Sequence, residues 1–421
     1  MRGSPVSSIH LTVASRPITS TEATAAPSAD RRAYRMSSLD ILRGLVIVVM
    51  ALDHVRDFVM TAAVQDPTAD PTSPLLFATR WITHFCAPTF VFLAGTSAGL
   101  MARRKGSVEL ASFLLARGLW LIVLDLVVIS PTWSFAPTGI AELGGRTYLA
   151  LQVIWVIGAS MVVLAGAQLL GRHMCLAIGA AILLGHNLLD AIWPAASTTG
   201  STAALWAVLH ARQLYEVGPF RIFFSYPLLP WTGVMLVGYG AAGLFELPEK
   251  RRGERLLRIG MGLIIAFILI RALNVYGDPH PWDFDPSKPA ASVMSFLGTT
   301  KYPPSLLYVL MTLGPAAIAC AFVERLHGPL RNVLVTFGRA PLAFYIAHLY
   351  LIHAAAVVLG IAQGFAAQQF LTYYRFFPKG YGVGLPGVYL IWVTIVVVLY
   401  PLCRWVAAVK ARRQDWWLSY V

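Results

Sequence analysis

Residues 305–323 read SLLYVLMTLGPAAIACAFV, a run without a single charged side chain. A helix needs about 20 apolar residues to cross the hydrocarbon core of a bilayer, so this run is long enough to span a membrane. Similar runs recur along the chain. They predict an all-α fold, a polytopic integral membrane helical bundle with about ten transmembrane helices. The expected spans are residues 39–63, 85–101, 110–129, 148–170, 175–193, 226–245, 256–276, 305–323, 334–360 and 388–409.

The composition of the 421 residues also indicates a membrane protein, because 57% are hydrophobic and only 13% are charged. A soluble domain carries about 25% charged residues. The net charge of +13 would suggest a nucleic-acid partner in a soluble protein. Here the basic residues cluster in short segments between apolar runs, which is typical of membrane proteins. No nucleic-acid partner is therefore expected.

The positions of the basic residues predict the orientation. With the N-terminus in the cytoplasm, basic clusters such as residues 103–105 and 250–258 fall in cytoplasmic turns. The opposite segments are longer and richer in aromatic residues. This pattern predicts that both termini are cytoplasmic. Residues 1–35 hold no apolar signal-peptide core and are expected to form a disordered cytoplasmic segment, before a membrane domain at residues 36–421.

Several familiar site patterns do not occur in the sequence. There is no Walker A, GxSxG, HExxH or Rossmann pattern, which argues against an ATP-driven pump and a soluble hydrolase. The cysteines form no Cys-x-x-Cys pair and lie in or beside apolar runs, so neither a metal site nor a disulfide framework is expected. They are Cys86, Cys175, Cys320 and Cys403.

The first expected span holds the densest set of ionisable residues, at Asp40, Arg43, Asp53, His54 and Asp57. Ionisable groups inside a membrane are costly and usually mark a functional site. Arg43 and His54 are about three helical turns apart, so both point the same way, roughly 16 Å from each other along the axis. One face of one helix therefore presents a cation near the cytoplasm and an imidazole deep in the membrane.

This spacing suits acyl-CoA, with its phosphates near Arg43 and its thioester near His54. An imidazole titrates near neutral pH and is a natural proton acceptor. Asp57, three residues further on, could orient the ring. In the alternative interpretation, Arg43 contacts phospholipid headgroups and His54 forms a hydrogen bond within the bundle. Gly44 would let a neighbouring helix or a ligand approach closely.

Other polar residues are weaker candidates. His84, at the outer end of the second span, is expected at about the depth of His54, unless it caps a helix. Arg117 and Arg339 lie towards the cytoplasmic side and could bind CoA phosphates, although structural ion pairs are the simpler interpretation for them and for Asp125 and Arg271. His348 and His353 are interpreted as hydrogen-bonding groups of the bundle. The candidate catalytic residues are His54, Asp57, His84 and Asp53, and the candidate cofactor-binding residues are Arg43, Arg117 and Arg339.

The segment Ser38-Leu-Asp-Ile-Leu-Arg-Gly44 resembles the opening of the first span in the transmembrane acyltransferase superfamily. It looks most like the bacterial relatives of heparan-α-glucosaminide N-acetyltransferase. The resemblance extends from about Met36 to the C-terminus through residues 85–95, 226–233, 301–305, 337–345 and 415–420.

Arg43 and His54 also match the first-span pattern Leu-Asp-x-Leu-Arg-Gly followed by histidine of the related acyltransferase-3 family. The resemblance implies transfer of an acyl group, commonly acetyl, from cytoplasmic acyl-CoA to an acceptor across the bacterial inner membrane, commonly a sugar. Arg43 would bind acyl-CoA and His54 would be catalytic. In the animal enzyme the proposed histidine lies in the loop before the second span, so His84 stays open as the alternative base.

The rival hypothesis is a proton-coupled transporter or a lipid or glycolipid permease, which would use the same charges as a path. No internal repeat is visible, and many transporters are built from repeats. On the enzyme hypothesis, acetyl-CoA or another acyl-CoA is the co-substrate, and a carbohydrate or glycolipid is the acceptor. Outer aromatic residues would form an interfacial belt and a platform for sugar rings. The oligomeric state stays open, with a homodimer as one alternative.

Overall fold

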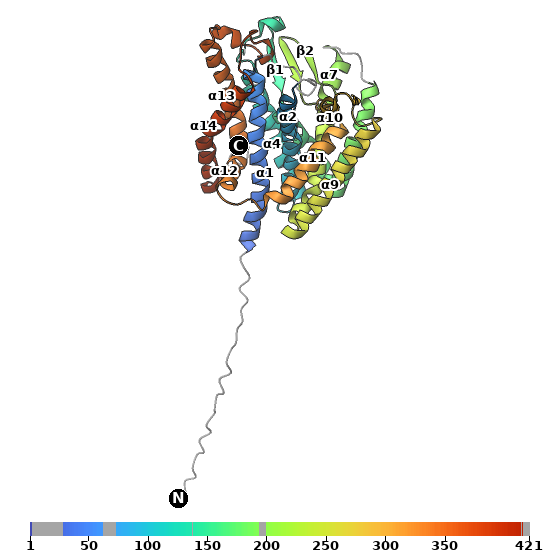
Figure 1. Cartoon of the computed structure of the whole chain (residues 1–421). Helices are drawn as coiled ribbons and strands as arrows, with labels where there is room; N and C mark the ends of the chain where they lie inside the picture. Colours follow the sequence, from blue (N-terminus) through green and yellow to red (C-terminus); the bar gives the residue numbers. More distant parts are fainter. Residues whose placement is uncertain (2–27, 62–72, 137, 193–198, 414, 416–421) are drawn as a thin grey trace.

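The computed structural model describes residues 1, 28–61, 73–136, 138–192, 199–413 and 415 (Figure 1). The predicted segment 1–35 lies outside the described residues apart from residue 1 and residues 28–35, which begin the first helix. The helices are α1 (Ser28–Val59), α2 (Pro74–Thr83), α3 (Cys86–Met101), α4 (Ser107–Leu124), α5 (Val153–Ala167), α6 (Arg172–Gly185), α7 (Ser201–Leu209), α8 (Leu228–Ala241), α9 (Glu249–Leu273), α10 (Pro289–Leu297), α11 (Leu306–Val323), α12 (Pro329–Arg339), α13 (Pro341–Ala362) and α14 (Leu385–Arg412).

The prediction of a polytopic helical membrane protein is confirmed. In the part of the chain that the structure describes, nine helical segments are long and apolar enough to cross a membrane. Each contains most of one predicted span, and α2 and α3 together make the first of the nine. The remaining predicted span falls in α1, which has 32 residues but carries the charged groups named above.

Two predicted spans have different boundaries in the structure. Residues 147–151 of the fourth span form a strand, and α5 begins only at Val153. The ninth span is two helices, because α12 ends at Arg339 and α13 begins at Pro341. Proline disfavours helical geometry in the residue before it, and Ala340 between the two helices has φ −123° and ψ 43°.

A small sheet at one end of the bundle was not predicted. Strand β3 (Phe220–Phe224) lies between β1 (Thr147–Leu151) and β2 (Gln213–Val217), parallel to the first and antiparallel to the second. Figure 1 shows the sheet, α7 and α10 at the end of the molecule where α1 finishes. The long α1 therefore connects this end to the opposite one.

Glycines bring α1 and α12 into backbone contact. A β-carbon at Gly44 would overlap the carbonyl oxygen of Leu334, and one at Gly338 would overlap the carbonyl oxygen of Asp40. Small residues allow such close crossings in membranes, where packing drives helix association. The close approach predicted at Gly44 is thus confirmed. Reciprocal glycine contacts also join α3 to α8, α4 to α5 and α9 to α11.

Candidate active site

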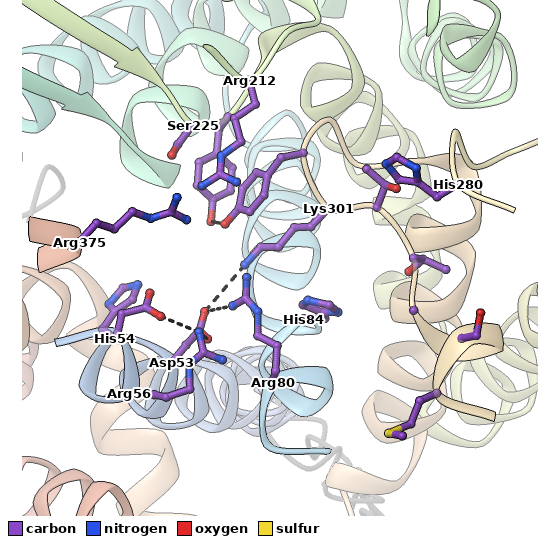
Figure 2. A pocket seen from close by; sticks show the side chains of 18 of the residues that line it. Asp53, His54, Arg56, Arg80, His84, Arg212, Ser225, His280, Lys301 and Arg375 are labelled. Atoms are coloured by element: carbon purple, nitrogen blue, oxygen red, sulfur yellow. Dashed lines mark hydrogen bonds and ion pairs between the residues drawn. The ribbon is translucent and has the colours of Figure 1, made fainter. Parts of the chain in front are cut away.

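A cavity of about 630 Å³ lies at the sheet end of the bundle. Its walls come from the end of α1, from α2, from α10, from the segment after β3, and from the loops before β2, α11 and α14. The four residues predicted as catalytic, Asp53, His54, Asp57 and His84, all line it. Residues from two helices that are separate in the sequence are therefore brought to one space (Figure 2).

Asp53 is the centre of an ion-pair network beside this space. Its carboxylate accepts a hydrogen bond from Arg80 of α2, lies 3.0 Å from Arg56 Nη2, and lies 3.9 Å from Lys301 Nζ. The network joins α1, α2 and the loop before α11. Arg56 also donates to Asp57 Oδ1 at 2.5 Å. The carboxylate of Asp57 therefore pairs with Arg56. No hydrogen bond joins Asp57 to His54 in the described structure.

The ring of His54 is held by another histidine. His54 Nδ1 lies 2.8 Å from His348 Nε2, and the two rings stack with centroids 5.0 Å apart. Trp133 and Tyr345 pack edge-on against the His54 ring, at 5.4 and 6.2 Å. His348 thus does form a bundle hydrogen bond, as expected, but its partner is the leading catalytic candidate.

His84 is placed differently. It follows the last residue of α2, and its backbone carbonyl accepts a hydrogen bond from the Tyr308 hydroxyl at 2.7 Å. The ring is 2% exposed, and its Nδ1 has no hydrogen-bond partner among the described residues. His84 shares the cavity with His54, but its ring is packed edge-on by Tyr308 at 5.5 Å and receives no hydrogen bond from a described residue.

Tyrosines and cations form the opposite wall. The Tyr302 ring is contacted by two cations, Arg212, whose Cζ is 4.3 Å from the ring centroid, and Lys301, whose Nζ is 5.1 Å away. Its hydroxyl is 3.5 Å from that of Tyr226. Burial alone would raise the pKa of Tyr302, but the charges of Lys301, Arg80 and Arg212 outweigh it and lower this pKa.

Arg212 forms no ion pair with a carboxylate in the described part of the chain, whereas Arg375 is attracted to the carboxylate of Asp57. Figure 2 shows Arg212, Lys301 and Arg375 around the same open space as His54. Lys301 is paired with Asp53, whereas Arg212 contacts only the rings of Phe223 and Tyr302. The wall opposite His54 is therefore suited to polar or anionic groups next to flat apolar rings.

The three predicted cofactor-binding arginines do not line the cavity. Arg43 donates to Asp40 at 2.9 Å and to Ser97 at 3.1 Å, and Arg339 lies 3.6 Å from Asp40. Lys410 donates to the backbone of Arg339 at 3.3 Å and is within electrostatic range of Arg43 and Arg117. Arg43, Arg339 and Lys410 therefore lie around a single carboxylate, Asp40, in the first half of α1, and Arg117 is near Lys410.

Two further charged residues are structural, but not through the ion pairs that were expected. Arg271 donates to the carbonyl oxygens of His280, Ser295, Phe296 and Gly298, at 2.9 to 3.1 Å. It therefore fixes α10 and its loops against α9. Asp125 accepts from the backbone N–H of Gln152 at 3.1 Å, just before α5. Backbone groups replace the opposite charges in both cases.

Arg80, Arg212, Lys301, Tyr302 and His348 were not among the predicted site residues. In the sequence, the segments containing Lys301 and Tyr226 contribute only to the family resemblance. No group of three or more His, Cys, Asp or Glu side chains in the described residues is arranged to hold a metal ion. The sequence feature that could have identified Arg80 and Lys301 as site residues is a charged side chain in a region that is expected to be buried.

Comparison with known proteins gives one family. Residues 35–276 match the family described as heparan-alpha-glucosaminide N-acetyltransferase, catalytic, and this range is more than half of the chain. No curated protein matches the chain. The matched range includes His54, His84 and Arg212, whereas Lys301, His348 and Arg375 lie beyond it.

Proposed function

Because the chain belongs to the heparan-α-glucosaminide N-acetyltransferase catalytic family, we propose that it is a membrane acetyltransferase that uses acetyl-CoA, or another acyl-CoA, and a glycan-like acceptor. The observation that carries the proposal is His54, whose ring is oriented at Nδ1 and whose Nε2 has no partner in the described residues, on the wall of a 630 Å³ cavity. A positioned imidazole beside a cavity can act as a general base.

The donor is proposed to enter from the other end of α1. Arg43, Arg339 and Lys410 lie there around the Asp40 carboxylate, with Arg117 near Lys410, so the cluster is rich in positive charge. Phosphates bind such clusters through charge-assisted hydrogen bonds. CoA is long enough to keep its phosphates at Arg43 while its thioester reaches His54, roughly 16 Å along the helix.

The acceptor is proposed to bind against the aromatic wall of the cavity. Trp133, Tyr226, Tyr302, Tyr373 and Tyr374 line the space beside His54. Flat rings pack against the apolar faces of sugars, and the neighbouring cations can bind hydroxyl or acidic groups. A carbohydrate or glycolipid therefore fits this wall better than an apolar molecule.

In the proposed reaction, His54 Nε2 takes the proton from the acceptor hydroxyl or amine. The acceptor oxygen or nitrogen forms a bond to the acyl carbon while the carbon–sulfur bond breaks. The proton held by His54 then neutralises the departing thiolate, so the enzyme returns to its starting state. Asp57 and Asp53 hold Arg56, Arg80 and Lys301 in place around the reacting groups.

The basic segments support a proposal for the orientation of the protein in its membrane. We propose that residues 36–421 form one acyltransferase domain in the bacterial cytoplasmic membrane, related to the acyltransferase-3 family, with both termini in the cytoplasm. The arginine cluster then faces cytoplasmic acyl-CoA, and the cavity faces an extracytoplasmic acceptor.

The test is acetyl-CoA binding and thioester hydrolysis by the purified, detergent-solubilised protein. Arg43→Ala should lose binding, and His54→Ala should bind but not turn over. Arg258→Ala, at a side chain 79% exposed on α9, is the matched control for lost positive charge, and the exposed His327→Ala is the control for a lost imidazole. Both controls should behave as the intact protein.

The transporter hypothesis predicts the opposite pattern. Failure of the intact protein to bind acetyl-CoA would reject the acyltransferase proposal. Movement of a labelled sugar or glycolipid into proteoliposomes without acyl consumption would then support transport, with His54 as part of a proton path.

A further inference from the structure

The partner of His54 is itself fixed by a backbone carbonyl. His348 is fully buried in α13, and its Nδ1 lies 3.0 Å from the carbonyl oxygen of Phe344. A carbonyl oxygen can only accept a hydrogen bond, so His348 Nδ1 carries the proton. In a neutral imidazole the other nitrogen is then an acceptor, which makes His348 Nε2 the acceptor of this pair.

This assignment determines the protons of His54. Since His348 Nε2 accepts at 2.8 Å, His54 Nδ1 must donate. A neutral His54 that carries its proton on Nδ1 has a free lone pair on Nε2. No described residue forms a hydrogen bond with that nitrogen, and His54 lines the cavity.

We propose that His348 is a positioning residue that holds His54 in the tautomer whose basic Nε2 is available to the cavity. This inference rests on the proposed function for the identity of the reaction. His348 touches no reacting group and acts only through His54. The arrangement parallels metal-bound and catalytic histidines, whose second nitrogen is commonly bound to a group that selects the tautomer.

Packing keeps both rings from turning. His348 is stacked on Phe344 at 5.2 Å, and Tyr345 packs edge-on against it at 5.4 Å. The charged groups near His54 are Asp53, Arg56, Arg80 and Lys301. These groups bind one another and no hydrogen bond from them to the ring is present in the described structure. The tautomer therefore depends on His348.

The first test needs no turnover. Diethyl pyrocarbonate acylates an unprotonated imidazole nitrogen. The folded protein is labelled and then digested, and mass spectrometry of the peptide that contains His54 reports the availability of its Nε2 among the ten histidines of the chain. We compare the natural protein with His348→Leu, which offers no acceptor, and His348→Gln, whose amide can accept from His54 and donate to Phe344. Phe344→Leu is the control that disturbs packing but keeps both hydrogen bonds.

Labelling of His54 should slow severalfold in His348→Leu, because the ring can then carry its proton on Nε2. His348→Gln and Phe344→Leu should label close to the natural rate. Equal labelling of the natural protein and a folded His348→Leu variant would overturn the inference, as would a His348→Gln variant that labels as slowly as His348→Leu.

The second test separates this inference from the proposed function. If acetyl-CoA turnover is present, His348→Leu should lower kcat by about 10²–10⁴-fold and leave acetyl-CoA binding unchanged. An equal loss of binding would instead indicate a structural role. If the natural protein does not bind acetyl-CoA but labelling follows the pattern above, the proposed function fails while the assignment of His348 stands.

Discussion

At the scale of the residue, Asp53 balances three cations that come from three segments of the chain. Arg56, Arg80 and Lys301 all reach its carboxylate, which is 7% exposed. Removing one partner of a buried ion pair leaves uncompensated charge, which is costlier than exchanging the whole pair for apolar groups. The cavity wall thus depends on this one aspartate.

Asp53→Asn should therefore destabilise the protein by about 3–5 kcal/mol, since three cations lose their shared carboxylate. The measurement is thermal unfolding of the purified protein in detergent. Asp283→Asn is the matched control, because Asp283 also lines the cavity but is exposed. A drop in Tm of the same size in both variants would argue against the network.

Tyr302 gives a prediction about titration. Its pKa is lowered because the charges of Lys301, Arg80 and Arg212 favour the phenolate and outweigh burial. As the pH rises, tyrosinate absorbance should therefore begin to appear below the usual range of tyrosine, about 10. Tyr302→Phe should remove this early component, and Lys301→Gln should move it to higher pH. An unchanged titration curve in Tyr302→Phe would contradict the assignment.

At the scale of the element, the position of α1 depends on glycine. Gly44 and Gly338 let the backbones of α1 and α12 touch, and Asp40, which pairs with both Arg43 and Arg339, lies at this crossing. The same crossing therefore packs two helices and assembles the proposed donor site. A side chain here would disturb both.

Gly44→Leu should lower stability by about 3 kcal/mol, the upper part of the usual range for overpacking, because its side chain meets the backbone of α12, which cannot move aside as a flexible side chain can. Thermal unfolding and acetyl-CoA binding should fall together. Gly262→Leu is the control, since a β-carbon at this α9 glycine has no neighbouring atom within 4 Å. If Gly44→Leu unfolds at the same temperature as Gly262→Leu, the crossing does not limit stability.

At the scale of the whole molecule, α1 connects two regions of different chemistry. The first half of α1 holds Asp40 and its cations, and the last turns of α1 hold Asp53 and His54 on the cavity wall. Figure 1 shows α1 running between the two ends of the bundle. A transferase that joins a donor and an acceptor from opposite sides of a membrane needs a donor site and an acceptor site that face opposite sides. The proposed orientation can be tested without any substrate.

Cysteine labelling in membrane vesicles tests the proposed orientation of the protein in the membrane. Arg104→Cys lies in the turn between α3 and α4, Asp283→Cys lies at the cavity end, and the four natural cysteines are buried. In right-side-out vesicles, a membrane-impermeant maleimide should label Asp283→Cys at once and Arg104→Cys only after permeabilisation. The reverse result would place the cavity on the cytoplasmic side and reject the proposed direction of transfer.

The sequence was sufficient for features that depend on local geometry. Apolar runs of spanning length identified the membrane helices, since hydrocarbon excludes an unpaired backbone. The position of His84 at the end of the second span predicted that it lies at the depth of His54, and both residues line the cavity. The shared face of Arg43 and His54 stays a prediction from helical periodicity. The break at Pro341 was also readable in principle, but the long apolar run obscured it.

Only the tertiary structure decided which groups meet. His348 is 294 residues from His54, and Arg80 and Lys301 reach Asp53 from two other segments. Such contacts depend on which helices pack together, and that choice is made by small residues whose partners lie far away in the chain. The sequence alone determined a membrane bundle with a charged first helix. Folding determined that the histidine of this helix is oriented by another histidine inside an aromatic, cation-lined cavity.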